Sequence, residues 1–193
     1  LSGIITMFVL FATSIASQAL VEERRNKTLE RLLTTRMTEG ELFLGKFLAN
    51  AGRAFMQSLI LLLLAAIVFQ LFTPISFLSA AIVALVFSAA AGALGLLIGS
   101  AAKTPAQANT ISTIFTMAMT MLGGTFFTIE KGSSLYILSR LSLNTYANNA
   151  FKSIISRGQD LTSVSQELLL IAGVTVAILV LARFIFTLVG VGK

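Results

Sequence analysis

The sequence contains no cysteine and no histidine, and only 11% of its 193 residues are charged. The two missing residue types exclude disulfides, thiol nucleophiles, imidazole bases and the usual zinc ligands. An ordinary soluble domain carries about 25% charged residues. A chain this poor in charge is therefore not expected to be a soluble domain.

A phosphate-binding loop is also missing. The nearest match to G-x-x-x-x-G-K-[ST] is Gly40–Phe47, which ends in phenylalanine where the hydroxyl that binds magnesium should stand. No hydrophobic strand precedes this match. We therefore expect that the chain binds no cofactor or metal and does not hydrolyse ATP by itself.

Hydrophobic residues make up 56% of the sequence, and most of them lie in five long stretches. Each stretch is almost free of charge and approaches the roughly 20 residues that a helix needs to cross a bilayer. The fold class predicted is therefore a single-domain, all-α integral membrane protein over residues 1–193. A very apolar soluble bundle fits less well, because its helices would alternate polar and apolar faces. The expected spans are 1–20, 39–72 (which begins as a connecting helix outside the membrane), 77–102, 106–129 and 167–190.

Basic residues are unevenly distributed between the two sides of the membrane. If 21–53 is cytoplasmic, ten basic residues lie inside and four lie outside. The positive-inside rule then places the C-terminus inside and the 130–166 region, with one or two short helices, outside. The net charge of +6 is thereby explained by topology, without binding to nucleic acid.

The loop after the first span contains a short amphipathic segment. Leucines at spacings i, i+3 and i+4 form an apolar stripe among charges of both signs, which predicts a helix over 22–34. Such a helix can dock on a soluble protein partner, or it can rest on anionic lipid headgroups. The mixed signs favour the protein partner, because a headgroup-binding helix carries mainly Lys and Arg. The leucines are Leu29, Leu32 and Leu33.

A capping box and two sets of small or polar residues complete the pattern. Thr38 and Glu41 have the spacing of an N-terminal capping box, so the helix of 39–72 should begin there. Small residues spaced by four allow close helix packing, either within the chain or between two copies; they are Ala91, Gly95 and Gly99. Polar residues on one face of 106–129 either line a transport route or hydrogen-bond neighbouring helices; they are Asn109, Ser112, Thr113, Thr116 and Thr120.

The loop motifs resemble those of the ABC-2 permease family. Glu22–Thr38 and Glu41–Lys46 follow the pattern E-[KR]-x-x-G-T-L-E-x-L-L-x-T-P-x-S and then E-x-x-x-G-K. Gly124–Ile129 is similar to the family's G-x-F-F-P-I stretch. The departures are Lys27 for the usual glycine, and Arg36 and Thr128 for frequent prolines.

This resemblance implies a six-helix permease fold of the type V exporter kind, in which the chain supplies helices two to six. The family's first helix would precede Leu1. The resemblance also implies two cytosolic ATPase subunits that hold ATP and magnesium, a second permease subunit, surrounding membrane lipid, and a multi-pass location in a prokaryotic cytoplasmic membrane. The 22–34 segment would be the coupling helix. Its expected contact residues are Glu22, Arg25, Leu29, Glu30, Leu32 and Leu33.

The function expected is therefore export driven by ATP that a partner hydrolyses. One alternative is a transporter or channel that needs no ATPase, which would usually carry carboxylates or broken helices inside the membrane. Another is a membrane scaffold without a transport role. The sequence does not specify the substrate, although the absence of central charge in the spans favours lipophilic cargo. The residues expected to line a route are Asn109, Thr113, Thr116 and Thr120.

Overall fold

A computed structural model describes residues 2–34, 37–69, 73–126 and 134–189. All regular elements in these ranges are helical, which confirms the all-α part of the expected fold class. The elements are α1 (Ser2–Arg25), α2 (Thr28–Leu33), α3 (Glu39–Phe69), α4 (Pro74–Ala101), α5 (Pro105–Leu122), α6 (Ser134–Ser139), α7 (Leu143–Arg157), the 3-10 helix η1 (Leu161–Val164) and α8 (Ser165–Val189).

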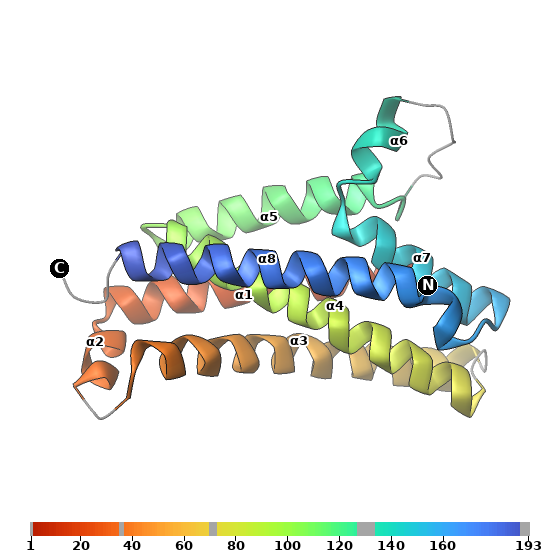
Figure 1. Cartoon of the computed structure of the whole chain (residues 1–193), viewed down its shortest axis with the longest axis horizontal. Helices are drawn as coiled ribbons and strands as arrows, with labels where there is room; N and C mark the ends of the chain where they lie inside the picture. The colour runs from red at the N-terminus through yellow and green to blue at the C-terminus, as the bar shows by residue number, and fades with distance from the viewer. Residues whose placement is uncertain (1, 35–36, 70–72, 127–133, 190–193) are drawn as a thin grey trace.

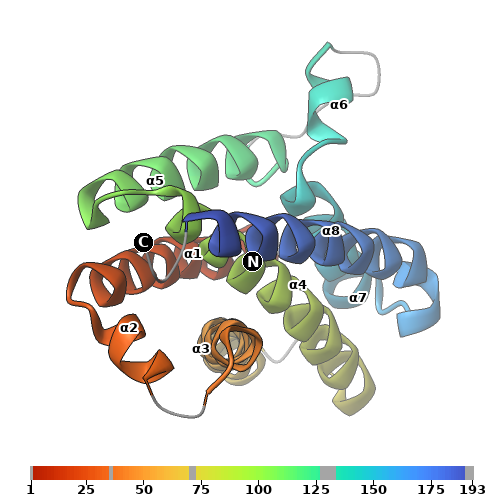
Figure 2. The same cartoon turned by 60° about the vertical axis from the view of Figure 1, so that its left-hand side comes forward.

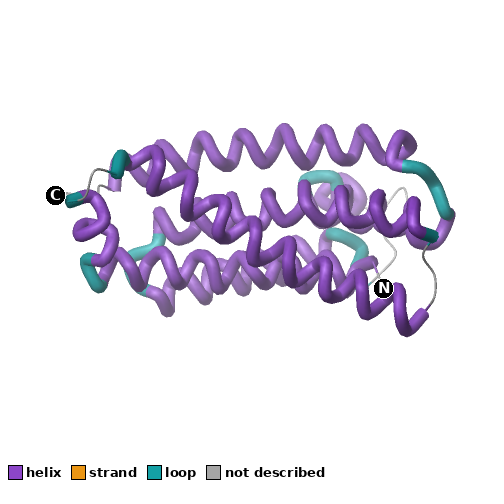
Figure 3. Tube along the Cα trace, turned by 90° about the horizontal axis from the view of Figure 1, so that it is seen from below, coloured by secondary structure: helices purple, strands orange, loops and turns teal. Residues whose placement is uncertain are grey.

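The long helices form an elongated bundle (Figure 3). Figure 1 shows α1, α3 and α8 running along the long axis, with α4 crossing them at an angle. The short helix α2 lies at one end of the bundle, next to the C-terminal end of α8, whereas α6 and α7 lie toward the other end (Figures 1 and 2). We call these the α2 end and the α7 end.

Four of the described helices are long and apolar enough to cross a membrane: α1, Glu39–Val68 of α3, α4, and Leu161–Leu188, which joins η1 to α8. The fifth expected span, 106–129, corresponds to α5, which ends at Leu122. A turn follows at once, with Gly124 at a φ of 66°. Because α5 is short and polar along one face, its length and composition do not mark it as a span. Residues 127–129 lie outside the described part, so the fifth span stays a prediction.

Several helices begin at the capping residues that the sequence indicates. The Thr38 N–H donates to Glu41 Oε2 at 2.8 Å, and the Glu41 N–H donates to Thr38 Oγ1 at 3.3 Å. These bonds confirm the predicted capping box of α3. Thr104 caps α5, and Pro105 stands in its first turn. Thr73 and Ser76 form a second capping box at the start of α4.

The central helix of the bundle is α4, which packs against α1, α3 and α8. Its small residues allow this close approach. A Cβ on Gly95 would lie 2.6 Å from Ala16 Cβ of α1, and one on Gly99 would lie 2.9 Å from the Ser17 carbonyl oxygen. Ala91 is fully buried in the core of the same chain. The small residues therefore serve packing inside one chain, which was one of the two alternatives.

Candidate functional site

The junction between α1 and α2 divides the helix that the sequence predicts over 22–34. The first part of that range continues α1 up to Arg25, and α2 begins at Thr28. Between them, Lys27 takes a left-handed conformation with a φ of 55°. Its N–H donates to the Arg24 carbonyl at 3.1 Å, while its own carbonyl accepts from the Arg31 N–H at 3.1 Å. The chain therefore changes direction at Lys27 without losing its hydrogen bonds.

Leu29 and Leu32 of α2 face the bundle, and this corrects the expectation that these two leucines contact a partner. Leu29 is 1% exposed and belongs to an apolar cluster whose other members come from α1, α3, α4 and α8. Leu32 packs against the same cluster and is half-buried. The ends of the chain's own long helices cover these two leucines, where a partner protein or the membrane was expected to do so. The side chain of Leu33 lies outside the described part.

The outward side of the α1–α2 junction is polar and charged. Two of the predicted coupling residues, Glu22 and Arg25, are exposed there, while the side chain of Glu30 lies outside the described part. This surface carries both signs of charge and is what remains available to a partner. Together with Glu22 and Arg25, its exposed residues are Asn26, Lys27, Thr28 and Arg31; we call this set the junction surface.

Charged side chains tie the junction to several long helices. Glu23 at the end of α1 forms an ion pair with Lys46 of α3. The Arg24 guanidinium donates to the Ser100 carbonyl at 3.1 Å and also to the Ala102 carbonyl. These carbonyls lie at the C-terminal end of α4, where the helix dipole favours a cation.

A further set of contacts ties α8 to the start of α3. Arg183 Nη1 donates to the Glu39 carbonyl at 3.2 Å, and the guanidinium lies 5.7 Å from the Phe43 ring centroid. Phe43 in turn meets Phe186 edge-on at 5.6 Å. The α2 end thus joins α1, α3, α4 and α8 in one polar and aromatic network.

The polar face of α5 packs against α1. Asn109 Oδ1 accepts from Ser14 Oγ at 2.7 Å and from Gln18 Nε2 at 3.2 Å. Thr116 Oγ1 donates to the Leu10 carbonyl at 3.3 Å. Thr116 and Thr120 are 1% and 2% exposed, whereas Thr113 is half-buried. Ser112, which pairs with Ser17 at 2.8 Å, completes what we call the α1–α5 seam.

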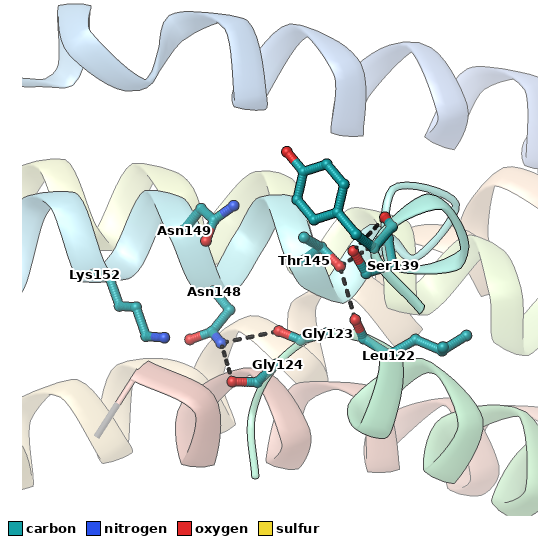
Figure 4. A pocket seen from close by; sticks show the side chains of 9 residues that line it. Leu122, Gly123, Gly124, Ser139, Thr145, Asn148, Asn149 and Lys152 are labelled. Atoms are coloured by element: carbon teal, nitrogen blue, oxygen red, sulfur yellow. Dashed lines mark hydrogen bonds between the residues drawn. The ribbon is translucent and has the colours of Figure 1, made fainter. Parts of the chain in front are cut away.

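At the α7 end, side chains of α7 hold the end of α5 (Figure 4). Asn148 Nδ2 donates to the carbonyls of Gly123 and Gly124 at 3.1 and 3.3 Å. Thr145 Oγ1 lies 3.3 Å from the Leu122 carbonyl oxygen and 2.6 Å from that of Ser139. These residues line a small, partly open cavity of about 180 Å³. The expected short helices at this end therefore anchor α5.

The ties at the α2 end were missed by the sequence analysis. Arg24, Lys46 and Arg183 were considered only as basic charges, and Glu23 only as one of the charges around the leucine stripe. One signal could have suggested the Glu23–Lys46 pair. Glu23 lies in the last turn of one apolar helix, and Lys46, with the opposite charge, lies in the first turns of the next. The backbone carbonyls that accept hydrogen bonds from Arg24 and Arg183 cannot be recognised from the sequence, because every residue has such a carbonyl.

The comparisons with known proteins bear on this arrangement. A family model described as ABC-2 type transporter matches residues 1–156. None of the curated proteins matches the chain. The matched residues include the junction surface and the α1–α5 seam.

Proposed function

Because the chain belongs to the ABC-2 type transporter family, we propose that it is the permease subunit of an exporter driven by ATP. A separate cytosolic subunit, present in two copies, binds ATP and magnesium and hydrolyses the nucleotide. A second permease subunit, identical or related, completes the pathway. The complex lies in the cytoplasmic membrane of a prokaryotic cell, with the α2 end in the cytosol, as the distribution of basic residues favours.

The junction surface is the place where the ATPase subunit docks. Exposed charges of both signs, such as Glu22, Arg25 and Arg31, are suited to a polar protein interface. Leu29 has a different role from the one expected, because it holds α2 against the long helices. A push on the junction surface is therefore passed to the bundle and is not absorbed by a loose loop.

The single observation that supports coupling is the network at the α2 end. Glu23 links α1 to α3, and Arg24 links α1 to the end of α4. When nucleotide binding draws the two ATPase copies together, a displacement of α2 reaches these helices as a rigid-body shift. The α1–α5 seam makes α5 move with α1, so that the bundle changes which side of the membrane it opens to.

Charge reversal of the junction surface tests this proposal. In the variant R25E/R31E, two exposed cations become anions without any change in the core. We expect the ATPase subunit to dissociate during purification and transport to be lost. The new carboxylates would repel the acidic groups that the two arginines are proposed to meet on the ATPase subunit. The measurements are copurification of the ATPase subunit and the stimulation of ATP hydrolysis by the transported substrate.

A matched control is Arg157→Glu, which reverses an exposed charge at the C-terminal end of α7. This variant should retain both the complex and the stimulated hydrolysis. If R25E/R31E also retains a coupled complex, the junction surface is not the docking site and the proposed mechanism is wrong.

A further inference from the structure

A polar stripe runs along the side of α3 that borders α1. Lys46, Asn50, Arg53 and Gln57 recur at helical spacing, so they share one face. Two of them contact α1 directly: Lys46 pairs with Glu23, and Gln57 Nε2 donates to the Phe8 carbonyl at 3.3 Å. Asn50 is half-buried beside these contacts, whereas Arg53 is exposed.

Arg53 lies in the Glu39–Val68 stretch of α3, which is long and apolar enough to cross a membrane. The Glu23–Lys46 pair belongs to the α2 end, and Arg53 follows Lys46 by about two turns, or ~10 Å along the helix. With Lys46 at the edge of the hydrocarbon core, Arg53 would lie about a third of the way across its thickness of about 30 Å. A charged side chain at this depth is costly and needs a counter-charge or access to the membrane surface.

This chain does not offer Arg53 a counter-charge at that depth. The sequence has no acidic residue between Leu42 and Ile129, and α1 has none before Glu22. Among the described side chains, no carboxylate lies within ion-pair distance of the Arg53 guanidinium. Arg53 therefore needs either a counter-charge from outside the described residues or access to the headgroups at the membrane surface.

The surroundings of Arg53 have the chemistry of a phospholipid. Helical side chains lean toward the N-terminus, so Arg53 on α3 leans toward the α2 end and its headgroups, with the amide donors of Asn50 about one turn closer. A guanidinium binds a phosphate through two parallel hydrogen bonds. On the other side of Arg53, toward the α7 end, the same flank is exposed and apolar; it consists of Met56 (63% exposed), Ile60 (59%), Leu64 (53%) and Phe8 of α1 (41%).

We propose that the α1–α3 flank is a binding site for an anionic phospholipid of the leaflet at the α2 end. The guanidinium of Arg53 and the amide of Asn50 hold the phosphate, and the acyl chains lie along Met56, Ile60 and Leu64. The apolar flank continues for a length that acyl chains would cover, which favours a lipid over a short polar ligand. A partner helix that brings a carboxylate to Arg53 is the competing occupant.

The test uses tryptophan fluorescence, because the chain has no tryptophan of its own. The variant Met56→Trp places a single reporter on the flank. The protein is reconstituted in phosphatidylcholine vesicles that contain either brominated phosphatidylglycerol or brominated phosphatidylcholine. The quenching of tryptophan fluorescence by each brominated lipid gives the relative affinity of the two lipids for the flank. We expect about a five-fold preference for phosphatidylglycerol, the size that one basic residue near an anionic surface contributes.

Two further variants, each carrying the reporter, decide whether Arg53 is responsible. Arg53→Gln should abolish the preference, and Arg53→Lys should retain part of it, because the charge remains but the two parallel hydrogen bonds are lost. Lys103→Gln removes an exposed cation at the same end of the bundle and should leave the preference unchanged. Equal quenching by both lipids, or a preference that survives Arg53→Gln, would overturn the proposal. Quenching by neither lipid would also overturn it and would indicate that a protein covers the flank.

Discussion

At the residue scale, Lys27 connects a departure from the family pattern to backbone geometry. The pattern that the loop resembles has glycine at this position, and the structure gives Lys27 a φ of 55°. Residues with a Cβ pay roughly 1–2 kcal/mol for the left-handed conformation, which glycine adopts freely. The turn between α1 and α2 therefore needs this conformation, and lysine tolerates it on an exposed surface.

This geometry predicts an order of stability for substitutions at Lys27. Lys27→Val should lower the free energy of unfolding by about 1–2 kcal/mol, because a β-branched side chain is the least tolerant of a positive φ. Lys27→Gly should be neutral or slightly stabilising, since the relieved strain offsets the greater freedom of glycine in the unfolded chain. Thermal unfolding in detergent measures both. Equal melting temperatures for the valine and lysine proteins would show that this turn is not left-handed.

At the element scale, α2 and α5 are both held by neighbouring helices of the same chain. Leu29 fixes α2 on the cluster at the α2 end, and the α1–α5 seam fixes α5 through hydroxyl and amide groups. A short helix such as α2 has little stability of its own. Its position therefore depends on tertiary packing.

For α2, adjacent substitutions separate packing from docking. Leu29→Asp places an unpaired carboxylate in an apolar cluster and should destabilise the α2 end by several kcal/mol. Thr28→Asp is the control, because Thr28 is exposed and lies in the first turn of α2, where an acidic residue is favourable. We expect rapid proteolysis within residues 26–38 for the first variant only. If Leu29→Asp stays as resistant as the unmodified protein but loses the ATPase subunit, Leu29 faces the partner.

For α5, removal of one hydroxyl decides between packing and a transport route. Thr116→Val keeps the shape of the side chain but removes its bond to the Leu10 carbonyl, which should cost about 1 kcal/mol or somewhat more. Thr110→Val on the same helix is the control, because Thr110 is exposed and should change stability little. A Thr116→Val protein with normal stability and an altered range of transported substrates would instead assign Thr116 to the route.

The sequence predicts the long helices well and the α2 end poorly. Charge-free stretches identify α1, α3, α4 and α8, and the cap at Thr38 fixes where α3 begins, because these signals are local. The burial of Leu29 depends on the flanking helices α1 and α3 and on the distant helices α4 and α8, so spacing shows only that the stripe is covered and not by what. The same applies to the α5 face, where periodicity alone left packing and pathway as equal alternatives.

At the scale of the whole molecule, α1 connects the other helices. It is joined to α3 by the Glu23–Lys46 pair, to α4 by Arg24 and by the close approach at Gly95, and to α5 by the seam. A displacement of the α1–α2 junction therefore reaches three helices directly. This connectivity is the physical basis for assigning the coupling role to the α2 end.

The central claim is that an ATPase subunit acts on the junction surface, and site-directed crosslinking tests it most directly. The chain has no cysteine, so Arg31→Cys gives a single attachment point for a photoreactive maleimide on the exposed side of α2. Ser163→Cys on η1 is exposed at the opposite end and serves as the control. We predict a covalent product with the copurifying ATPase subunit from Arg31→Cys alone, with a yield that changes when ATP is added. A product from Ser163→Cys, or none from Arg31→Cys in an intact complex, would contradict the account.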